Sequence, residues 1–107
     1  MTSELTDSHP APLRLLIVDD QPLIRRGLAM VLAAEEGIVI VGQAADGVEA
    51  IEMALATSPD VVVMDLQMPR TSGVVARREI TAQRPATRVV VLPTWAGVER
   101  FRMIATF

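Results

Sequence analysis

The sequence predicts an α/β fold in which a doubly wound parallel sheet is covered by helices on both faces. Two observations lead to this class. Four short runs rich in Val, Ile and Leu are spaced along the chain, which is typical of strands buried on both sides. Segments with apolar residues at helical spacing lie between them. Strands and helices that alternate in this way form right-handed crossovers and therefore a parallel sheet.

The first strand and helix are predicted on either side of two acidic residues, Asp19 and Asp20, where an apolar run gives way to helical spacing. The apolar run Leu13–Val18 stops abruptly there, which predicts a buried strand. Pro22 suits the first turn of a helix, where its missing N–H is not needed. The helix is expected to end near Gly37. Its expected buried stripe is Ile24, Leu28 and Val31.

The middle of the chain predicts a second strand, a second helix and a third strand. Residues 38–41 are β-branched throughout, as in a strand. Asp46 and Glu49 have the spacing of a capping box, which marks a helix start. Residues 61–64 form the third apolar run, which ends at Asp65. The stripe expected to face the sheet in this second helix is Val48, Ile51 and Leu55.

The last third predicts one more helix and strand before a final helical segment. Ser72 can cap the third helix, and Pro85 breaks it. Residues 89–92 predict the fourth strand, which Pro93 stops because proline cannot donate to the ladder. Residues 96–107 can form a last helix. The buried residues expected in the third helix are Ala76 and Ile80.

Composition excludes several kinds of chemistry. The 107 residues include no cysteine, which excludes disulfides, thiol catalysis and zinc–thiolate sites. The only histidine, His9, lies in a polar N-terminal segment, which excludes a core site built around histidine. The net charge of −3 argues against this domain binding nucleic acid itself.

The N-terminal segment and the lengths of the apolar runs indicate where in the cell the protein is expected. Residues 1–12 are polar and proline-containing, without the basic and apolar regions of a secretory signal, so we expect a flexible tail. No run approaches the roughly 20 apolar residues that span a bilayer. We therefore expect a cytoplasmic protein without membrane contact.

Three acids follow predicted strands. Asp19 and Asp20 come directly after the first strand, and Asp65 closes the third. In an open α/β sheet, ligands bind at the carboxyl ends of the strands, and the first and third strands are natural neighbours there. Carboxylates brought that close repel each other unless a cation neutralises them, and Mg²⁺ fits because it needs few carboxylates and keeps several waters.

The alternative for such residues is structural. An aspartate that follows a strand often only caps the next helix or faces solvent, but three at one sheet edge favour a metal site. No segment matches a phosphate-binding loop or a dinucleotide fingerprint. A phosphoryl group at this edge would therefore be held by metal and backbone.

These residues resemble the receiver domain of two-component response regulators. The phrases LLIVDDQPLIRRGL, VGQAADGVEAIEMA and PDVVVMDLQMP are similar to the NarL/FixJ subfamily, whose receivers precede a LuxR-type helix-turn-helix. The resemblance implies a flavodoxin-like receiver fold over residues 13–107 with strand order 2-1-3-4. It further implies a signalling domain that regulates transcription, with a histidine kinase as partner, rather than a turnover enzyme.

The resemblance also assigns residue roles. Asp65 would be the phosphoacceptor, whose carboxylate attacks phosphorus and forms an acyl phosphate. Asp20, Asp65 and the backbone carbonyl of Gln67 would ligate Mg²⁺, and Asp19 would act through a metal-bound water. The cation would offset the charge between the carboxylate and the incoming phosphoryl group.

Two features depart from the family pattern. The Thr or Ser that ends the fourth strand in the family is Pro93 here, and Thr94 replaces it only if the loop shifts by one residue. The family lysine of the fifth strand has no counterpart, because all ten basic residues are Arg. The resemblance therefore implies that the fifth strand, its helix and the DNA-binding domain are missing from this chain.

Two other functions compete with the phosphoacceptor. A degenerate receiver would act as a dimerisation or docking module without phosphorylation, which Pro93 and the missing lysine favour. A Mg²⁺-dependent phosphohydrolase generally has a second acid two residues after its nucleophile, where Gln67 stands. We also expect a homodimer, because residues 89–92 would form an uncovered, uncharged edge strand.

Overall fold

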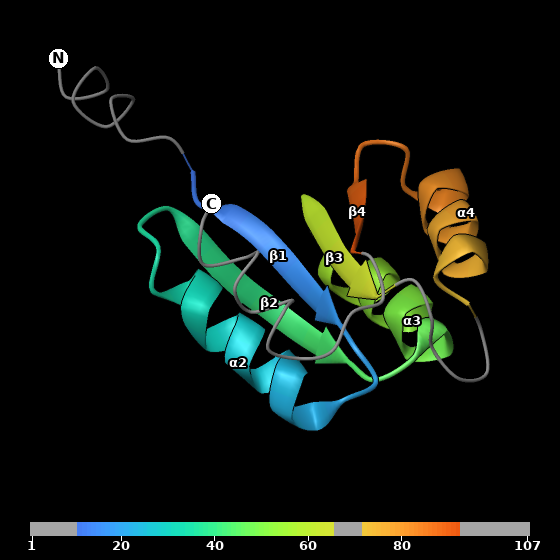
Figure 1. Ribbon diagram of the computed structural model, residues 1–107. Coiled ribbons are helices and arrows are strands. Elements are labelled where there is room, and N and C mark those ends of the chain that lie inside the picture. The colour runs from blue at the N-terminus through green and yellow to red at the C-terminus, as the bar shows by residue number, and fades with distance from the viewer. Residues whose placement is uncertain (1–10, 66–71, 93–107) are drawn as a thin grey trace, which may run out of the picture.

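The computed structural model describes residues 11–65 and 72–92 (Figure 1). Strands and helices alternate, as predicted. In chain order they are β1 (Leu13–Val18), α2 (Pro22–Ala33), β2 (Ile38–Ala44), α3 (Gly47–Thr57), β3 (Val61–Asp65), α4 (Gly73–Gln83) and β4 (Arg88–Leu92). No helix of this described part is long and apolar enough to cross a membrane.

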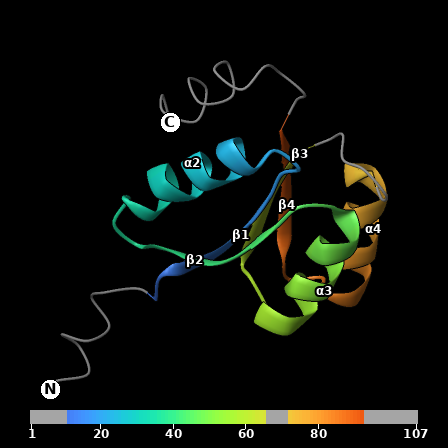
Figure 2. The same ribbon diagram turned by 90° about the horizontal axis from the view of Figure 1, so that it is seen from below.

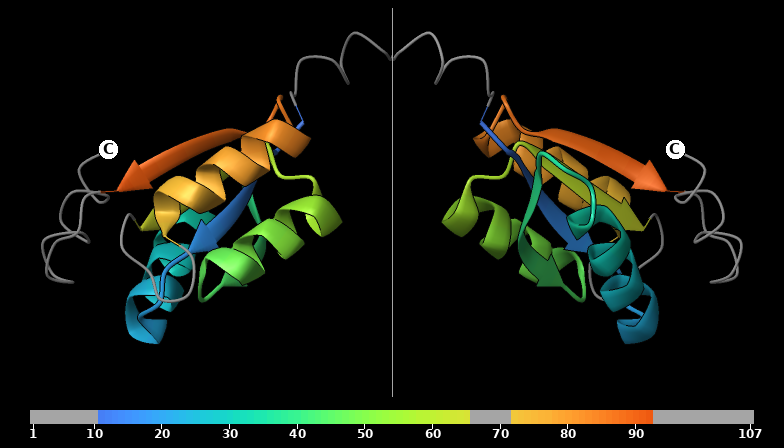
Figure 3. Two further views of the ribbon diagram at one scale, coloured as in Figure 1. Left: turned by 90° about the vertical axis from the view of Figure 1, so that its right-hand side faces the viewer. Right: turned by 90° about the vertical axis from the view of Figure 1, so that its left-hand side faces the viewer.

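The four strands form one parallel sheet in the order β2-β1-β3-β4, which confirms the predicted fold class and strand order. Helix α2 covers one face, while α3 and α4 lie together on the other (Figures 2 and 3). Strand β1 is central, with β2 on one side and β3 on the other. The chain therefore starts inside the sheet at β1, adds β2 on one side and then β3 and β4 on the other, as doubly wound proteins do.

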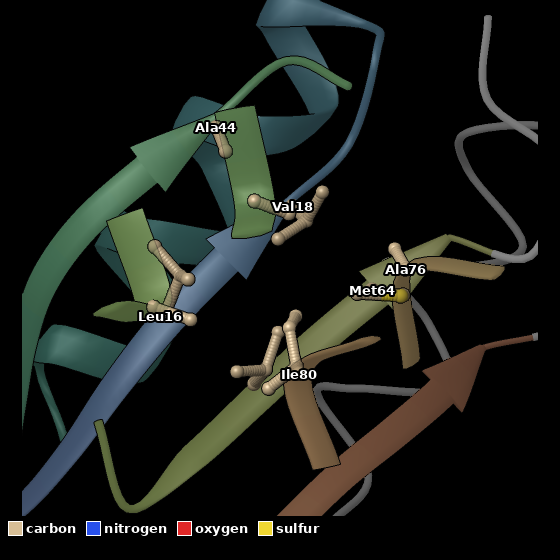
Figure 4. Close-up of a cluster of buried hydrophobic side chains, with 9 residues drawn as sticks. Leu16, Val18, Ala44, Met64, Ala76 and Ile80 are labelled. Carbon is tan, nitrogen blue, oxygen red and sulfur yellow. The ribbon is translucent and has the colours of Figure 1, made fainter. Parts of the chain in front are cut away.

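Two hydrophobic clusters flank the sheet because side chains alternate along each strand. Leu16 and Val18 of β1 point toward α3 and α4, where they meet Met64 of β3 (Figure 4). Leu15 and Ile17 belong to the cluster on the α2 face. Strand β1 is thus buried on both faces, as its nearly continuous apolar run predicts.

Helix α2 ends earlier than expected. Its last residue is Ala33, whereas the sequence suggested an end near Gly37. The intervening residues form a turn, in which Gly37 adopts a φ of +88° immediately before β2. A positive φ suits glycine, so Gly37 marks the reversal into the strand and not the helix cap. Ile24 and Leu28 are buried as predicted, but Val31 is only half-buried.

The start of α3 matches its predicted capping box. Asp46 Oδ1 accepts the N–H of Glu49 at 2.9 Å, and Glu49 Oε1 in return accepts the N–H of Ala45 at 2.7 Å. Asp46 thus satisfies a donor of the first helical turn, while Glu49 binds the N–H of the residue before the N-cap and not that of the N-cap itself.

The predicted buried stripe of α3 is wrong. Leu55 is 46% exposed, and Val48 and Ile51 are only half-buried. Small side chains permit the close approach that this helix makes to the sheet and to α4, so the larger apolar residues flank the contact. The residues of α3 that are fully buried are Gly47, Ala50 and Ala54.

Helix α4 and strand β4 agree with the prediction. Ser72 Oγ accepts the N–H of Val75 at 3.3 Å, and the helix stops before Arg84. Ala76 and Ile80 are buried against the sheet. The predicted tail, the stop at Pro93 and the helix over residues 96–107 fall wholly or mostly outside the described residues. The predicted domain boundaries therefore stay predictions.

Candidate functional site: an acidic cluster at the carboxyl edge of the sheet

Strands β1 and β3 bring the acidic residues to one edge. They pair in parallel, with Val18 beside Met64, so Asp19, directly after β1, and Asp65, the last residue of β3, come at the same edge of the sheet. Figure 4 shows the arrowheads of both strands pointing to this edge. The topology thus gathers residues that are far apart in the sequence.

One carboxylate oxygen each of Asp19, Asp20 and Asp65 lies within 4.8 Å of the others. Asp19 and Asp65 are only 1% and 2% exposed, whereas Asp20 is exposed. Buried carboxylates at this separation repel each other, and their burial weakens screening by water. The oxygen-only donor set, open to solvent on the Asp20 side, is the set that Mg²⁺ or Mn²⁺ prefers. The residues present therefore fit a hard divalent cation.

The backbone of Asp19 is held at both its polar groups. Its N–H donates to the carbonyl oxygen of Ala44 at the end of β2, at 3.1 Å. Its own carbonyl oxygen accepts a hydrogen bond of 2.9 Å from Nη1 of Arg25 on α2. Its side chain is also held, because Oδ1 accepts the N–H of Gln21 at 2.9 Å. The first acid of the pair is therefore fixed by three hydrogen bonds, which come from β2, from α2 and from the N-cap residue of α2.

The sequence pattern gave Arg25 no role, because it lies beside the apolar stripe of its helix. The structure shows it half-buried, with its guanidinium at the turn that carries the acids. The only signal in the sequence is its position, one turn into the helix that follows the acidic pair.

The remaining predicted site residues are not placed. Gln67, Pro93 and Thr94 lie outside the described residues. The acidic cluster is the part of the predicted site that the structure brings together.

The fold and the acidic cluster together define a class: doubly wound α/β proteins with clustered carboxylates at the carboxyl edge of the sheet. Comparison with known families narrows this class. Residues 15–105 match the response regulator receiver domain. The chain belongs to this family of signalling domains, as its sequence motifs predicted.

Curated relatives match most of this chain over only part of their own length. The transcriptional regulatory protein PdtaR of Mycobacterium tuberculosis is 49% identical over 92 residues, covering 85% of this chain and 44% of that protein. The uncharacterized transcriptional regulatory protein YxjL of Bacillus subtilis is 42% identical over 83 residues, covering 78% of this chain and 38% of that protein. A protein-glutamate methylesterase/protein-glutamine glutaminase of Myxococcus xanthus is 45% identical over 80 residues, or 75% and 23%. The chain thus spans less than half the length of these relatives.

Solved structures agree with the fold. The receiver domain of the putative response regulator NarL from Mycobacterium tuberculosis has a TM-score of 0.74 at 30% identity, covering 89% of this chain and 79% of that one. A LuxR-family two-component response regulator from Aurantimonas has a TM-score of 0.75 at 33% identity, covering 90% and 68%. Both likenesses extend over most of the present chain.

Proposed function

We propose that this chain is the phosphoacceptor domain of a response regulator, which takes a phosphoryl group from a histidine kinase onto Asp65. The observation that supports this proposal most is the convergence of Asp19, Asp20 and Asp65 at one edge of the sheet. Two strand ends supply these carboxylates, and the family match independently covers both strands.

In the proposed step, one carboxylate oxygen of Asp65 attacks phosphorus in line with the leaving nitrogen. The new O–P bond forms as the P–N bond to the kinase histidine breaks, and the imidazole keeps the electron pair and takes up a proton. The product is an acyl phosphate on Asp65. The burial of Asp65 supports this role, because burial restricts the side chain and limits access of competing water.

Asp20 and Asp65 would hold Mg²⁺ together with the carbonyl oxygen of Gln67, and Asp19 would contact it through water. When bound, the ion would offset the negative charge that accumulates between the carboxylate and the phosphoryl oxygens. The protein side chains position this site. Asp19 in particular is held through its N–H, its C=O and its carboxylate.

The output of the whole protein is a further proposal. PdtaR and YxjL are transcriptional regulatory proteins, and this chain covers less than half of each. We infer that the receiver regulates transcription in the cytoplasm through a DNA-binding domain beyond the present sequence. The methylesterases also share a receiver, so the family match alone does not fix the output.

A second candidate function is a docking module that is never phosphorylated. Pro93 favours it, because the family has a Thr or Ser at this position whose hydroxyl contacts the phosphoryl group, and proline has no hydroxyl. A hydrogen-bond donor aimed at developing charge contributes strongly to catalysis. If Asp65 is nevertheless phosphorylated, the reaction should be slow.

One experiment separates these functions. The chain is incubated with acetyl phosphate or phosphoramidate and Mg²⁺, and its intact mass is followed. A phosphoacceptor gains a single lasting phosphoryl group, whereas a docking module gains none. A phosphohydrolase consumes the donor continuously without a lasting adduct. Absence of an adduct in the wild type, at millimolar Mg²⁺ and long incubation, would overturn the proposed function.

A further inference from the structure

Arg25 contacts the backbone on both sides of Asp20. Its guanidinium donates to the carbonyl oxygen of Asp19 at 2.9 Å, and its own N–H donates to the carbonyl oxygen of Gln21 at 2.9 Å. The N–H of Gln21 is in turn bonded to Asp19 Oδ1. Arg25 therefore binds the carbonyl groups of the two residues on either side of the most exposed acid of the cluster, one through its side chain and the other through the first backbone bond of α2.

The hydrogen bond from Arg25 reaches the backbone where one element ends and the next begins. Strand β1 ends at Val18, and the first backbone bond of α2 goes to Gln21. The carbonyl of Asp19 lies between these two elements and accepts from the guanidinium. A charged donor binds a partly buried carbonyl more strongly than a neutral donor does. The guanidinium therefore ties the turn that carries the acids to α2.

We propose that Arg25 is a positioning residue of the acidic cluster, which holds the Asp19–Asp20 turn in the conformation that directs both carboxylates toward Asp65. This inference rests on the proposed function, since it concerns the same metal site. Arg25 acts through the backbone of Asp19 and touches neither the metal nor the phosphoryl group. Residues that orient metal-binding carboxylates set how well the site binds before any metal arrives.

Arg25 also brings a positive charge close to three carboxylates, so geometry and charge have to be separated. The neighbouring Arg26 offers a matched control, because it is exposed on the same helix and its removal changes the net charge equally. Arg25→Met removes both the bond and the charge, whereas Arg26→Met removes a charge alone. Arg25→Lys keeps the charge and one donor that can reach the carbonyl.

The test measures Mg²⁺ affinity by calorimetric titration in wild type and the three variants, with no phosphodonor present. We expect Arg25→Met to weaken binding by about 10-fold. Arg26→Met should change affinity by less than about 2-fold at moderate salt, because exposed charges are screened. Arg25→Lys should recover most of the loss. A second readout without metal is hydrogen exchange at the Gln21 amide, which should speed up in Arg25→Met only.

The outcomes discriminate between this inference and the proposed function. Equal affinities for Arg25→Met and wild type, or equal losses in the Arg25→Met and Arg26→Met variants, would overturn the positioning role and leave the phosphoacceptor proposal intact. Unchanged exchange at Gln21 would overturn it even if Arg25→Met proved unstable to titration. If wild type itself binds no Mg²⁺, the proposed metal site fails and the inference fails with it.

Discussion

An oxygen of Asp20 and an oxygen of Asp65 lie within 4.8 Å of each other, although one residue is exposed and the other is 2% exposed. The relationship exists because β1 and β3 are neighbours in the sheet. It places a solvent-accessible carboxylate beside a buried one, to which the proposed function gives the roles of metal ligand and nucleophile. A cation can enter from the Asp20 side while Asp65 stays fixed.

Magnesium should stabilise wild type and not Asp20→Asn. At a concentration ten times its dissociation constant, a ligand specific to the folded state adds about 1.4 kcal/mol to the free energy of unfolding. Without metal, Asp20→Asn should be more stable than wild type, because removing one of three like charges relieves repulsion. Thermal melts with and without millimolar Mg²⁺ measure both effects. Glu52→Gln, an equal charge change at an exposed position of α3, should leave the Mg²⁺ response unchanged. A Mg²⁺ response that survives in Asp20→Asn would contradict the assignment.

A second prediction concerns Thr87, a buried polar residue at the opposite end of the sheet. Its Oγ1 donates to the carbonyl oxygen of Pro59 at 2.7 Å and accepts from Arg84 Nε at 3.3 Å. Thr87→Val keeps the shape but leaves a buried carbonyl unpaired, which should cost about 1–3 kcal/mol of unfolding free energy in urea.

The control for Thr87 is the same change on α4. Thr81 Oγ1 donates to the carbonyl oxygens of Arg77 and Arg78, in an exposed setting where water can replace it. Thr81→Val should stay within about 0.5 kcal/mol of wild type. Equal losses of unfolding free energy in both variants would show that the hydrogen bond from Thr87 to Pro59 contributes no more than an exposed one.

A third prediction follows from Ser58, which caps the C-terminus of α3 with a φ of 51° and a ψ of 60°. The left-handed region costs a non-glycine residue about 1–2 kcal/mol. Glycine avoids this cost but gains unfolded-state freedom, so Ser58→Gly should stabilise the fold by about 0.5 kcal/mol. Ser58→Val should destabilise it, since a branched side chain tolerates this conformation poorly. Urea unfolding of the two variants gives the sign of each change in the free energy of unfolding. A Ser58→Val variant more stable than wild type would contradict the left-handed conformation of Ser58.

A fourth prediction concerns self-association through β4. Within the described residues β4 pairs only with β3, and Val90 is 48% exposed. We expect homodimers that involve this strand, and Val90→Lys should weaken them because a charge discourages edge pairing. Light scattering after size exclusion measures the mass. A monomeric wild type at high micromolar concentration would rule the assembly out.

Three strand positions were predictable because each apolar run is short and ends at an acid or a proline, whereas β2 runs to Ala44, three residues beyond its β-branched run 38–41. The same signal located Asp19, Asp20 and Asp65, since ligands gather at the carboxyl ends of parallel strands. Capping at Asp46 and Ser72 was equally visible, because caps depend on local spacing alone.

Two features needed the tertiary structure. The buried face of α3 is made of small residues, and a pattern search favours large ones such as Leu55. How closely a helix approaches its neighbours decides between them, and the sequence does not encode that distance locally. The bond from Arg25 to Asp19 is also invisible to periodicity, because it joins a side chain to a backbone carbonyl across a turn.

The most direct test of the central claim locates the phosphoryl group. Wild type is incubated with phosphoramidate and Mg²⁺, treated with borohydride, which reduces an acyl phosphate to an alcohol, digested and sequenced by mass spectrometry. The account predicts homoserine at position 65 alone, and no reduced residue in Asp65→Asn. Reduction at Asp19 or Asp20, or an adduct that persists in Asp65→Asn, would contradict it.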